Sequence, residues 1–203
     1  MRWLPYGADA VLVQCDSLDE MTAVRATVAA AEVPGVLEVI PGASTVLVVT
    51  SPGSKALPEV RALVEAADLA NPPAVDPRDV VLDVRYDGAD LELVAETAGL
   101  GVDEVVSLHT GAEYTVAFTG FAPGFAYLTG LPEQLRQPRL DTPRTKVPAG
   151  SVGVAGEFTG AYPRSSPGGW RLLGHTDAQL FDPHAERPVL LAPGDRVRFR
   201  SVR

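Results

Sequence analysis

The first part of the chain alternates short apolar runs with a segment of helical periodicity. Residues 10–14 form an apolar run that is typical of a strand. Ser17 and Glu20 then make a capping box, which marks the start of a helix. One face of this predicted helix carries Leu18, Met21, Val24 and Val28. The pattern therefore predicts a strand followed directly by an amphipathic helix.

Two β-branched runs follow, at 36–40 and 45–49, and they flank the turn-rich segment 41–44. This arrangement predicts a hairpin. A second helix is expected over about 57–67 and a last strand near Val80. The resulting order of elements matches a ferredoxin-like or split βαβ arrangement.

A proline-rich segment, 71–77, separates the two parts of the chain. Because proline neither continues a helix nor donates to a strand ladder, we place a domain boundary near residue 77. Residues 1–77 are then expected to form a small α/β domain, and residues 78–203 a second domain.

The second part begins with two predicted helices, 91–98 and 102–109, and then changes to short apolar runs separated by Gly and Pro. These runs are 114–118, 152–154, 170–173, 189–191 and 197–199. Many short strands with frequent turns are typical of a barrel or a sandwich. The whole chain is therefore expected to be an α+β protein.

Composition narrows the functional classes. The 203 residues are 46% hydrophobic and 21% charged, as in ordinary soluble globular proteins. The net charge of −9 opposes binding to nucleic acid or to an anionic membrane surface. Cys15 has no cysteine partner, and neither a secretory leader nor a run of about 18 apolar residues is evident. We expect a cytoplasmic protein.

The stretch 120–174 combines flexible turns with basic charge. It contains ten Gly and seven Pro, and its basic side chains outnumber its acidic ones. These basic residues are Arg136, Arg139, Arg144, Lys146, Arg164 and Arg171. Because glycine-rich loops can form anion-holding nests, the stretch predicts a carboxylate or phosphate site with Arg144 and Lys146 as its main contacts. The alternative is a set of barrel turns with solvated cations.

His109 is the histidine best placed for chemistry. It continues the apolar face of the predicted helix formed by Val102, Val105 and Val106. A partly buried imidazole can act as an acid or base near neutral pH. Equally, a histidine at a helix C-terminus can simply interact with the dipole there. The three histidines and Cys15 lack metal-site spacing, so we expect no metal site.

The sequence matches no common catalytic motif in its required context. The segment 149–153 resembles a nucleophile elbow, but its surroundings predict loop and strand, so Ser151 is expected to be a turn or binding residue. No P-loop is present, so any ATP is held in another way. Phe118 is expected in the barrel core. Phe121 and Phe125 flank a Pro-Gly turn and are expected at the mouth of a pocket.

Four ordered motifs carry a family resemblance. Residues 113–128, EYTVAFTGFAPGFAYL, resemble the family of the 5-oxoprolinase B subunit, which includes the sporulation kinase inhibitor KipI and the first allophanate hydrolase subunit. The segments 138–144, 147–153 and 159–170 agree with the same family in order. The likeness extends over the whole chain, more weakly before residue 80.

This resemblance implies a small α/β N-terminal domain followed by a cyclophilin-like β-barrel. It also implies partners, namely 5-oxoprolinase subunits A and C, with which the chain would hydrolyse 5-oxo-L-proline to L-glutamate at the expense of ATP. The nucleotide, as Mg-ATP, would be shared with a partner subunit.

Within such a site, Arg144 is expected to hold the substrate carboxylate or the transferred phosphate, and His109 to move a proton or orient the substrate. Backbone N–H groups of 120–124 and 150–153 would face developing negative charge. The expected substrate-binding residues are Gly120, Phe121, Pro123, Gly124, Phe125, Tyr127, Lys146, Pro148, Gly150, Ser151, Gly153, Tyr162, Gly168, Gly169 and Trp170.

Two other functions remain open because fold kinship does not fix function. One is a component that handles allophanate in urea breakdown. The other is an inhibitor of a sensor histidine kinase. Inhibition needs only a complementary surface, so substitution of His109 or Arg144 would leave it intact, whereas either catalytic function predicts severe loss.

Overall fold

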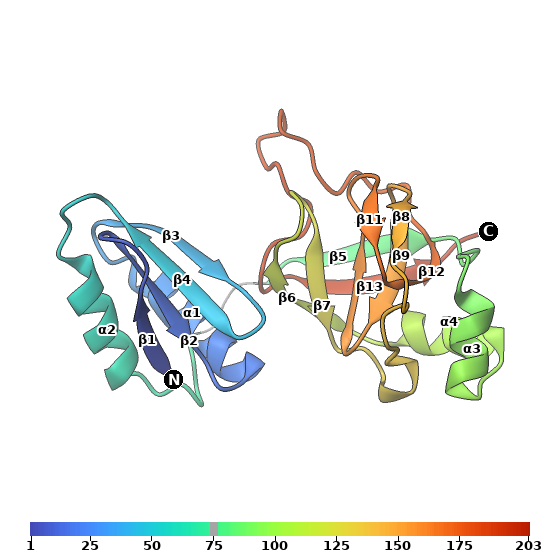
Figure 1. The fold of residues 1–203 in the computed structure, drawn as a ribbon, viewed down its shortest axis with the longest axis horizontal. Coiled ribbons are helices and arrows are strands. Elements are labelled where there is room, and N and C mark those ends of the chain that lie inside the picture. Colours follow the sequence, from blue (N-terminus) through green and yellow to red (C-terminus); the bar gives the residue numbers. More distant parts are fainter. Residues whose placement is uncertain (74–76) are drawn as a thin grey trace. The chain divides into compact units, whose positions relative to one another are not determined.

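A computed structural model describes residues 1–73 and 77–203, and its chain divides into two compact units, Met1–Asp76 and Pro77–Arg203 (Figure 1). Residues 74–76 of the predicted linker lie outside the described residues. Within the described part of the chain, no helix is long and apolar enough to cross a membrane. Each unit is built around its own sheet.

The first unit is a four-stranded antiparallel sheet with two helices. Its elements are β1 (Arg2–Pro5), β2 (Ala10–Gln14), α1 (Leu18–Ala31), β3 (Val36–Pro41), β4 (Thr45–Thr50) and α2 (Ala56–Ala66). The strand order is β1-β2-β4-β3. Both helices and the predicted hairpin are confirmed. Strand β1 was not predicted; it pairs with β2 from Arg2 opposite Gln14 to Pro5 opposite Val11.

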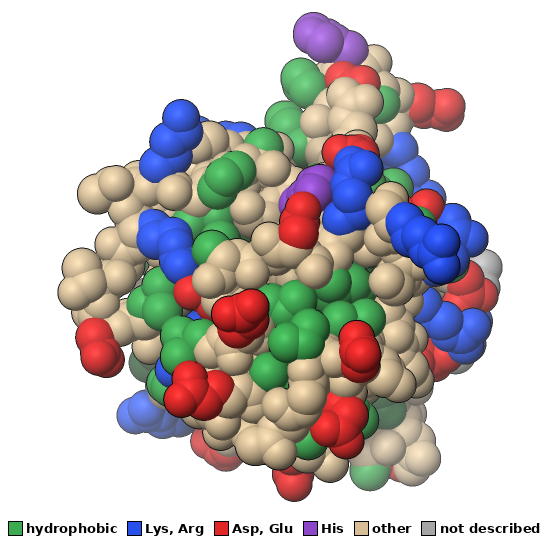
Figure 2. Space-filling view, turned by 90° about the vertical axis from the view of Figure 1, so that its right-hand side faces the viewer, with side chains coloured by type: hydrophobic (Ala, Val, Ile, Leu, Met, Phe, Trp, Pro, Cys, Tyr) green, Lys and Arg blue, Asp and Glu red, His purple; other side chains and the backbone are tan. Residues whose placement is uncertain are grey.

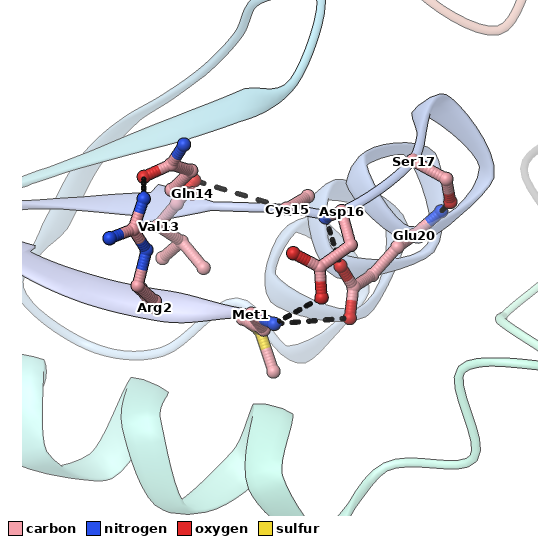
Figure 3. Close-up of polar contacts among 8 residues, drawn as sticks. All are labelled: Met1, Arg2, Val13, Gln14, Cys15, Asp16, Ser17 and Glu20. Atoms are coloured by element: carbon pink, nitrogen blue, oxygen red, sulfur yellow. Dashed lines mark hydrogen bonds and ion pairs between the residues drawn. The ribbon is translucent and has the colours of Figure 1, made fainter.

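The predicted N-cap Ser17 at the start of α1 is confirmed, but the second bond differs from that of a capping box, because Glu20 bonds the amide of Asp16 and not that of Ser17 (Figure 3). The Ser17 hydroxyl accepts a hydrogen bond from the Glu20 amide at 3.1 Å, and the Glu20 carboxylate accepts one from the Asp16 amide at 2.6 Å. The N-terminal ammonium group lies 2.8 Å from Asp16 Oδ2 and 3.9 Å from Glu20 Oε1. The bonds to Ser17 and Glu20 thus use backbone amides at the start of α1 that have no partner within the helix.

The second unit is a seven-stranded sheet with a separate two-stranded ribbon. Its elements are β5 (Asp79–Val84), α3 (Leu91–Ala98), α4 (Val102–Gly111), β6 (Tyr114–Thr119), β7 (Ala126–Thr129), the 3-10 turn η1 (Glu133–Leu135), β8 (Arg144–Val147), β9 (Ser151–Ala155), β10 (Phe158–Ala161), β11 (Ser166–Gly168), β12 (Arg171–His175) and β13 (Arg196–Ser201). The sheet order is β12-β9-β10-β7-β6-β13-β5, and β8 pairs with β11. Figure 1 shows α3 and α4 together at one end of this unit.

The sheet nearly closes into a barrel. Its two outermost strands are β12 and β5, and an antiparallel bridge between Arg85 and His175 joins the chain just after β5 to the end of β12. We call this junction the seam. The mixed α+β fold class and the barrel-like second unit are therefore confirmed.

Two sequence predictions about strands were wrong. The strand near Val80 belongs to the second unit, where β5 pairs in parallel with β13, instead of completing the first sheet. Residues 189–191 form no strand; Val189 makes only an isolated bridge with Phe181. An apolar run shows that a segment is buried but not which partner buries it.

Candidate functional site

A groove of about 400 Å³ lies beside the seam of the second unit. Arg144 and Lys146 of β8 and Ser151 of β9 line it together with Asp87 and His175. Arg144 and Lys146 point to the same side of β8 because side chains two positions apart on a strand share a face. The two cations predicted from sequence are therefore brought together in one groove, which Pro148 also lines.

Arg144 is held in place by a buried aspartate. Its Nη2 donates to Asp90 Oδ1 at 2.6 Å, while Asp90 Oδ2 accepts the amide of Leu172 at 2.7 Å. The Asp90 side chain is 6% exposed and that of Arg144 is 28% exposed. Because the pair is mutually neutralised, Arg144 lines the groove with a fixed guanidinium group that adds little net charge.

Lys146 supplies the free positive charge of the groove. Its side chain is exposed, and no carboxylate of residues 1–73 or 77–203 pairs with it. An unpaired ammonium group beside a fixed guanidinium group suits a ligand with one carboxylate or phosphoryl group.

The opposite wall of the groove is clamped to β12 by backbone contacts. Arg85 and His175 exchange backbone hydrogen bonds of 2.9 and 2.8 Å, and the Gly88 amide donates to the Leu173 carbonyl at 3.0 Å. A Cβ atom on Gly88 would overlap the backbone of residues 172–174, and one on Gly174 would overlap Arg85. Glycine is thus required at both positions, and the close approach fixes the loop that carries Asp87.

His175 belongs to a chain of four charged and polar side chains across the seam, with Asp87, Arg85 and Asp177. Its Nδ1 lies 2.8 Å from Asp87 Oδ1, and its Nε2 lies 3.0 Å from Arg85 Nε, which can only donate. Nε2 must therefore be the acceptor, and Nδ1 carries the hydrogen that Asp87 accepts. Arg85 also pairs with Asp177. Figure 2 shows one face of the protein on which histidine, basic and acidic side chains lie together.

The structure places His109 in the core of the second unit and outside this groove. It is fully buried; its Nδ1 lies 2.8 Å from Tyr86 Oη and its Nε2 3.0 Å from Thr159 Oγ1. The Thr159 hydroxyl donates to the Gly153 carbonyl at 3.0 Å, so it accepts from His109. Burial lowers the pKa of His109 to about 3, so the ring is neutral near pH 7.

A second, much smaller cavity of about 40 Å³ collects most of the predicted aromatic residues. It is lined by Phe121, Phe125, Tyr127, Arg139, Tyr162, Gly168, Gly169 and Trp170. A Cβ atom on Gly168 would approach the Tyr162 hydroxyl to 2.5 Å, so a larger residue there would displace the Tyr162 ring. Burial raises the pKa of Tyr162, so it stays protonated. Phe118 is buried as expected and stacks on Tyr127 with ring centroids 4.3 Å apart.

Phe121 combines exposure with backbone strain. Its side chain is 59% exposed and its φ of 65° lies in the left-handed region, which a bulky residue rarely adopts. Phe121 makes edge contacts with Phe125 and Tyr162. The expected position at a pocket mouth fits Phe121, which lies beside the small cavity, but is wrong for Phe125, which is buried in the aromatic core.

The predicted glycine-rich loops serve mainly as framework. Gly150 has φ +80°, and its amide donates to the Tyr162 carbonyl at 2.7 Å, while Gly153 is paired inside the sheet. Gly120 donates to Phe125 at 3.3 Å across the turn that contains Pro123, and Gly124 packs against residues 180–181. The amides of Gly150 and Gly120 are therefore already used within the protein.

Sequence analysis missed two residues that line the groove, Asp87 and His175, and the buried Asp90 that holds Arg144. His175 and Arg85 are 90 positions apart, and only closure of the barrel brings them into contact. Within the described residues, no group of three His, Cys, Asp or Glu side chains could hold a metal ion.

Comparisons with known proteins agree on the family. Residues 1–191 match the model of the carboxyltransferase domain, subdomain C and D. The chain is 46% identical to the 5-oxoprolinase B subunit of Escherichia coli O157:H7 over 83% of this chain and 79% of the relative. It is 45% identical to the Bacillus subtilis protein of the same name over 67% of this chain and 58% of the relative.

Solved structures share the fold. The crystal structure of TTHA0988 aligns with 97% of this chain and 40% of its own, with a TM-score of 0.82 and 35% identity. A conserved uncharacterized protein of Pyrococcus horikoshii aligns over 99% of this chain and 97% of its own, with a TM-score of 0.60 and 34% identity. The urea amidolyase of K. lactis, at 19% identity and a TM-score of 0.71, shares the fold alone. The chain belongs to the family of the 5-oxoprolinase B subunit, within the wider family of carboxyltransferase subdomains C and D.

Proposed function

We propose that the chain is the B component of an ATP-dependent 5-oxoprolinase that works in the cytoplasm with subunits A and C and converts 5-oxo-L-proline to L-glutamate. The observation that supports the proposal most is the groove of this chain. Its lining contains both the fixed guanidinium group of Arg144 and the unpaired ammonium group of Lys146. Such a pair suits a small carboxylate substrate.

The reaction explains why ATP is needed. A five-membered lactam is a poor electrophile, and its nitrogen is a poor leaving group. Transfer of the γ-phosphoryl group to the lactam oxygen breaks the bond to ADP and creates an activated imidate. One water then adds to the ring carbon and the carbon–nitrogen bond breaks, which gives the free amine and an acyl phosphate. A second water hydrolyses the acyl phosphate to phosphate and glutamate.

The groove fits one acidic group better than a whole nucleotide. Arg144 is neutralised by Asp90, and the negative charge of Asp87 offsets the positive charge of Lys146, so the lining carries little net positive charge and Lys146 is its one cation without an ion-pair partner among the described residues. A triphosphate carries more negative charge than these residues can match. ATP is therefore proposed to bind mainly through a partner subunit, with only its transferred phosphoryl group reaching Arg144 and Lys146.

His109 is proposed to organise the barrel core instead of touching substrate. Both of its ring nitrogens are bonded to protein hydroxyl groups, and its depressed pKa makes it a weak base. Catalysis in this subunit would then depend on Arg144 and Lys146 for binding and on the partner subunits for the remaining chemistry.

Glutamate formation tests the proposal. The chain is purified with its candidate subunits A and C, and product is measured from 5-oxoproline and ATP beside a preparation that lacks the chain. We expect activity only with the chain present, and losses of at least about ten-fold in kcat/KM for Arg144→Ala and Lys146→Ala. Asp79→Asn, at an exposed ion pair outside the groove, serves as the matched control. A stable complex that forms no glutamate contradicts the proposal.

The description of the matching family as a carboxyltransferase domain favours one alternative, a component that handles allophanate. Allophanate also carries one carboxylate and N–H groups, so the same groove would suit it. Supplying allophanate to the same complex and measuring ammonia distinguishes the two substrates.

A further inference from the structure

We propose that Asp87, oriented by His175, is the residue of the groove that accepts a hydrogen bond from an N–H group of the substrate. This inference rests on the proposed function and deepens it, because it assigns recognition of the lactam N–H to this chain. The ligand class is a small molecule with one acidic group, for Lys146, and one amide or lactam N–H, for Asp87.

The hydrogen-bond directions across the seam determine what Asp87 can offer. Since Arg85 Nε can only donate, His175 Nε2 accepts and His175 Nδ1 donates to Asp87 Oδ1. Arg85 is itself tied to Asp177. Arg85 thus fixes the imidazole through Nε2, and the imidazole orients one oxygen of Asp87 through Nδ1, so His175 acts as a positioning residue.

The second oxygen of Asp87 is left for a ligand. Within residues 1–73 and 77–203, no donor hydrogen bonds to Asp87 Oδ2. The Asp87 side chain is 59% exposed and lines the groove together with Lys146. An ionised carboxylate only accepts hydrogen bonds, so it favours an N–H group and disfavours an ether oxygen in the same place.

The position of Asp87 is built into the fold. Backbone hydrogen bonds of Arg85, Gly88 and Asp90 to β12 hold the loop on both sides of Asp87. Gly88 and Gly174 permit an approach that any side chain at either position would block. A donor in the groove would therefore meet an acceptor that needs little reorganisation, which is the condition for strong discrimination.

A pair of ligands isolates this contact. 5-Oxotetrahydrofuran-2-carboxylate has the shape and carboxylate of 5-oxoproline but carries a ring oxygen in place of the N–H. A site that hydrogen bonds a substrate N–H rejects the analogue that lacks it. We expect the wild-type complex with subunits A and C to bind 5-oxoproline at least about ten-fold more tightly than the lactone.

Substitutions at Asp87 and His175 should change this selectivity in defined ways. In Asp87→Asn, the amide oxygen accepts from His175 and the NH₂ group turns toward the ligand, which reverses the polarity offered to the N–H. We expect the ten-fold lactam preference to disappear, because lactam binding weakens while lactone binding strengthens once its ring oxygen faces a donor in place of a carboxylate. His175→Ala should lose about half of the preference on a logarithmic scale, and His175→Asn, whose amide can still donate to Asp87, should restore it.

The measurement is calorimetric binding of both ligands to the complex, together with KM and kcat for 5-oxoproline and the thermal unfolding midpoint of each variant. Asp79→Asn is the control and should keep the wild-type preference. If the wild-type complex forms glutamate but Asp87→Asn keeps its lactam preference, the role of Asp87 is refuted and the proposed function stands. If the wild-type complex neither binds nor converts 5-oxoproline, both are refuted.

Discussion

The surroundings of His109 and His175 differ in the charge of their partners and in solvent access. His109 is fully buried and bonded to the neutral hydroxyls of Tyr86 and Thr159. His175 is 36% exposed and lies between a carboxylate and a guanidinium group at the wall of a groove. The buried surroundings of His109 keep its ring neutral and fixed. The ring of His175 is instead hydrogen-bonded to Asp87, whose carboxylate lines the groove and can contact a ligand. Burial alone is therefore a poor guide to function.

The largest expected effect is on stability, at His109. His109→Ala leaves a cavity and removes the partners of Tyr86 and Thr159, so we expect a loss of at least about 3 kcal/mol in the free energy of unfolding. Denaturant titration of the chain measures it. A loss below about 1 kcal/mol would contradict the core role of this histidine.

The next effect concerns the close packing of Gly88 against strand β12, beside His175. Gly88→Ala would force a Cβ atom against the backbone of β12, and we expect a loss of about 1–3 kcal/mol in the free energy of unfolding. It should also weaken 5-oxoproline binding because Asp87 is displaced. Gly111→Ala is a suitable control, since nothing lies within 4 Å of the added Cβ. Equal free energies of unfolding for the two variants would show that Gly88 is not closely packed against β12.

The pH dependence of stability separates the two histidines further. The pKa of His109 is lowered in the folded protein to about 3 from an ordinary value of 6.5, so the unfolded chain takes up the proton more readily. Its contribution is present above about pH 6.5 and is lost as pH falls toward 3, by up to about 1.4 kcal/mol per pH unit. Denaturant titrations between pH 7 and pH 4 test this. In His109→Gln the acid slope should be shallower, and an unchanged slope would assign it to other groups.

The smallest expected effect is the stability of His175→Ala. Its partners Asp87 and Arg85 are exposed and Arg85 keeps its pairing with Asp177, so we expect a change of no more than about 1 kcal/mol in the free energy of unfolding. The same variant should nevertheless change ligand selectivity. A stability loss comparable to that of His109→Ala would remove the contrast between the two sites.

The sequence predicted the local elements well and their partners poorly. The helix cap at Ser17 and the strand at 114–119 depend on neighbouring residues, and both are confirmed. The hairpin at 36–50 was likewise predicted from its turn. The strand at 79–84 was correct as a strand but was placed in the wrong sheet, because pairing with β13 involves residues more than 100 positions away.

The residues of the candidate site were likewise predicted only in part. The sequence by itself determined the family motifs and the basic glycine-rich stretch with Arg144 and Lys146, since these depend on residue type and short spacing, but strand β8, which puts both side chains on one face, was not predicted. Only the tertiary structure decided that Asp90 neutralises Arg144, that His109 lies in the core, and that His175 meets Arg85 and Asp87. The physical reason is that these contacts arise when the barrel closes, and closure joins segments about which local periodicity carries no information.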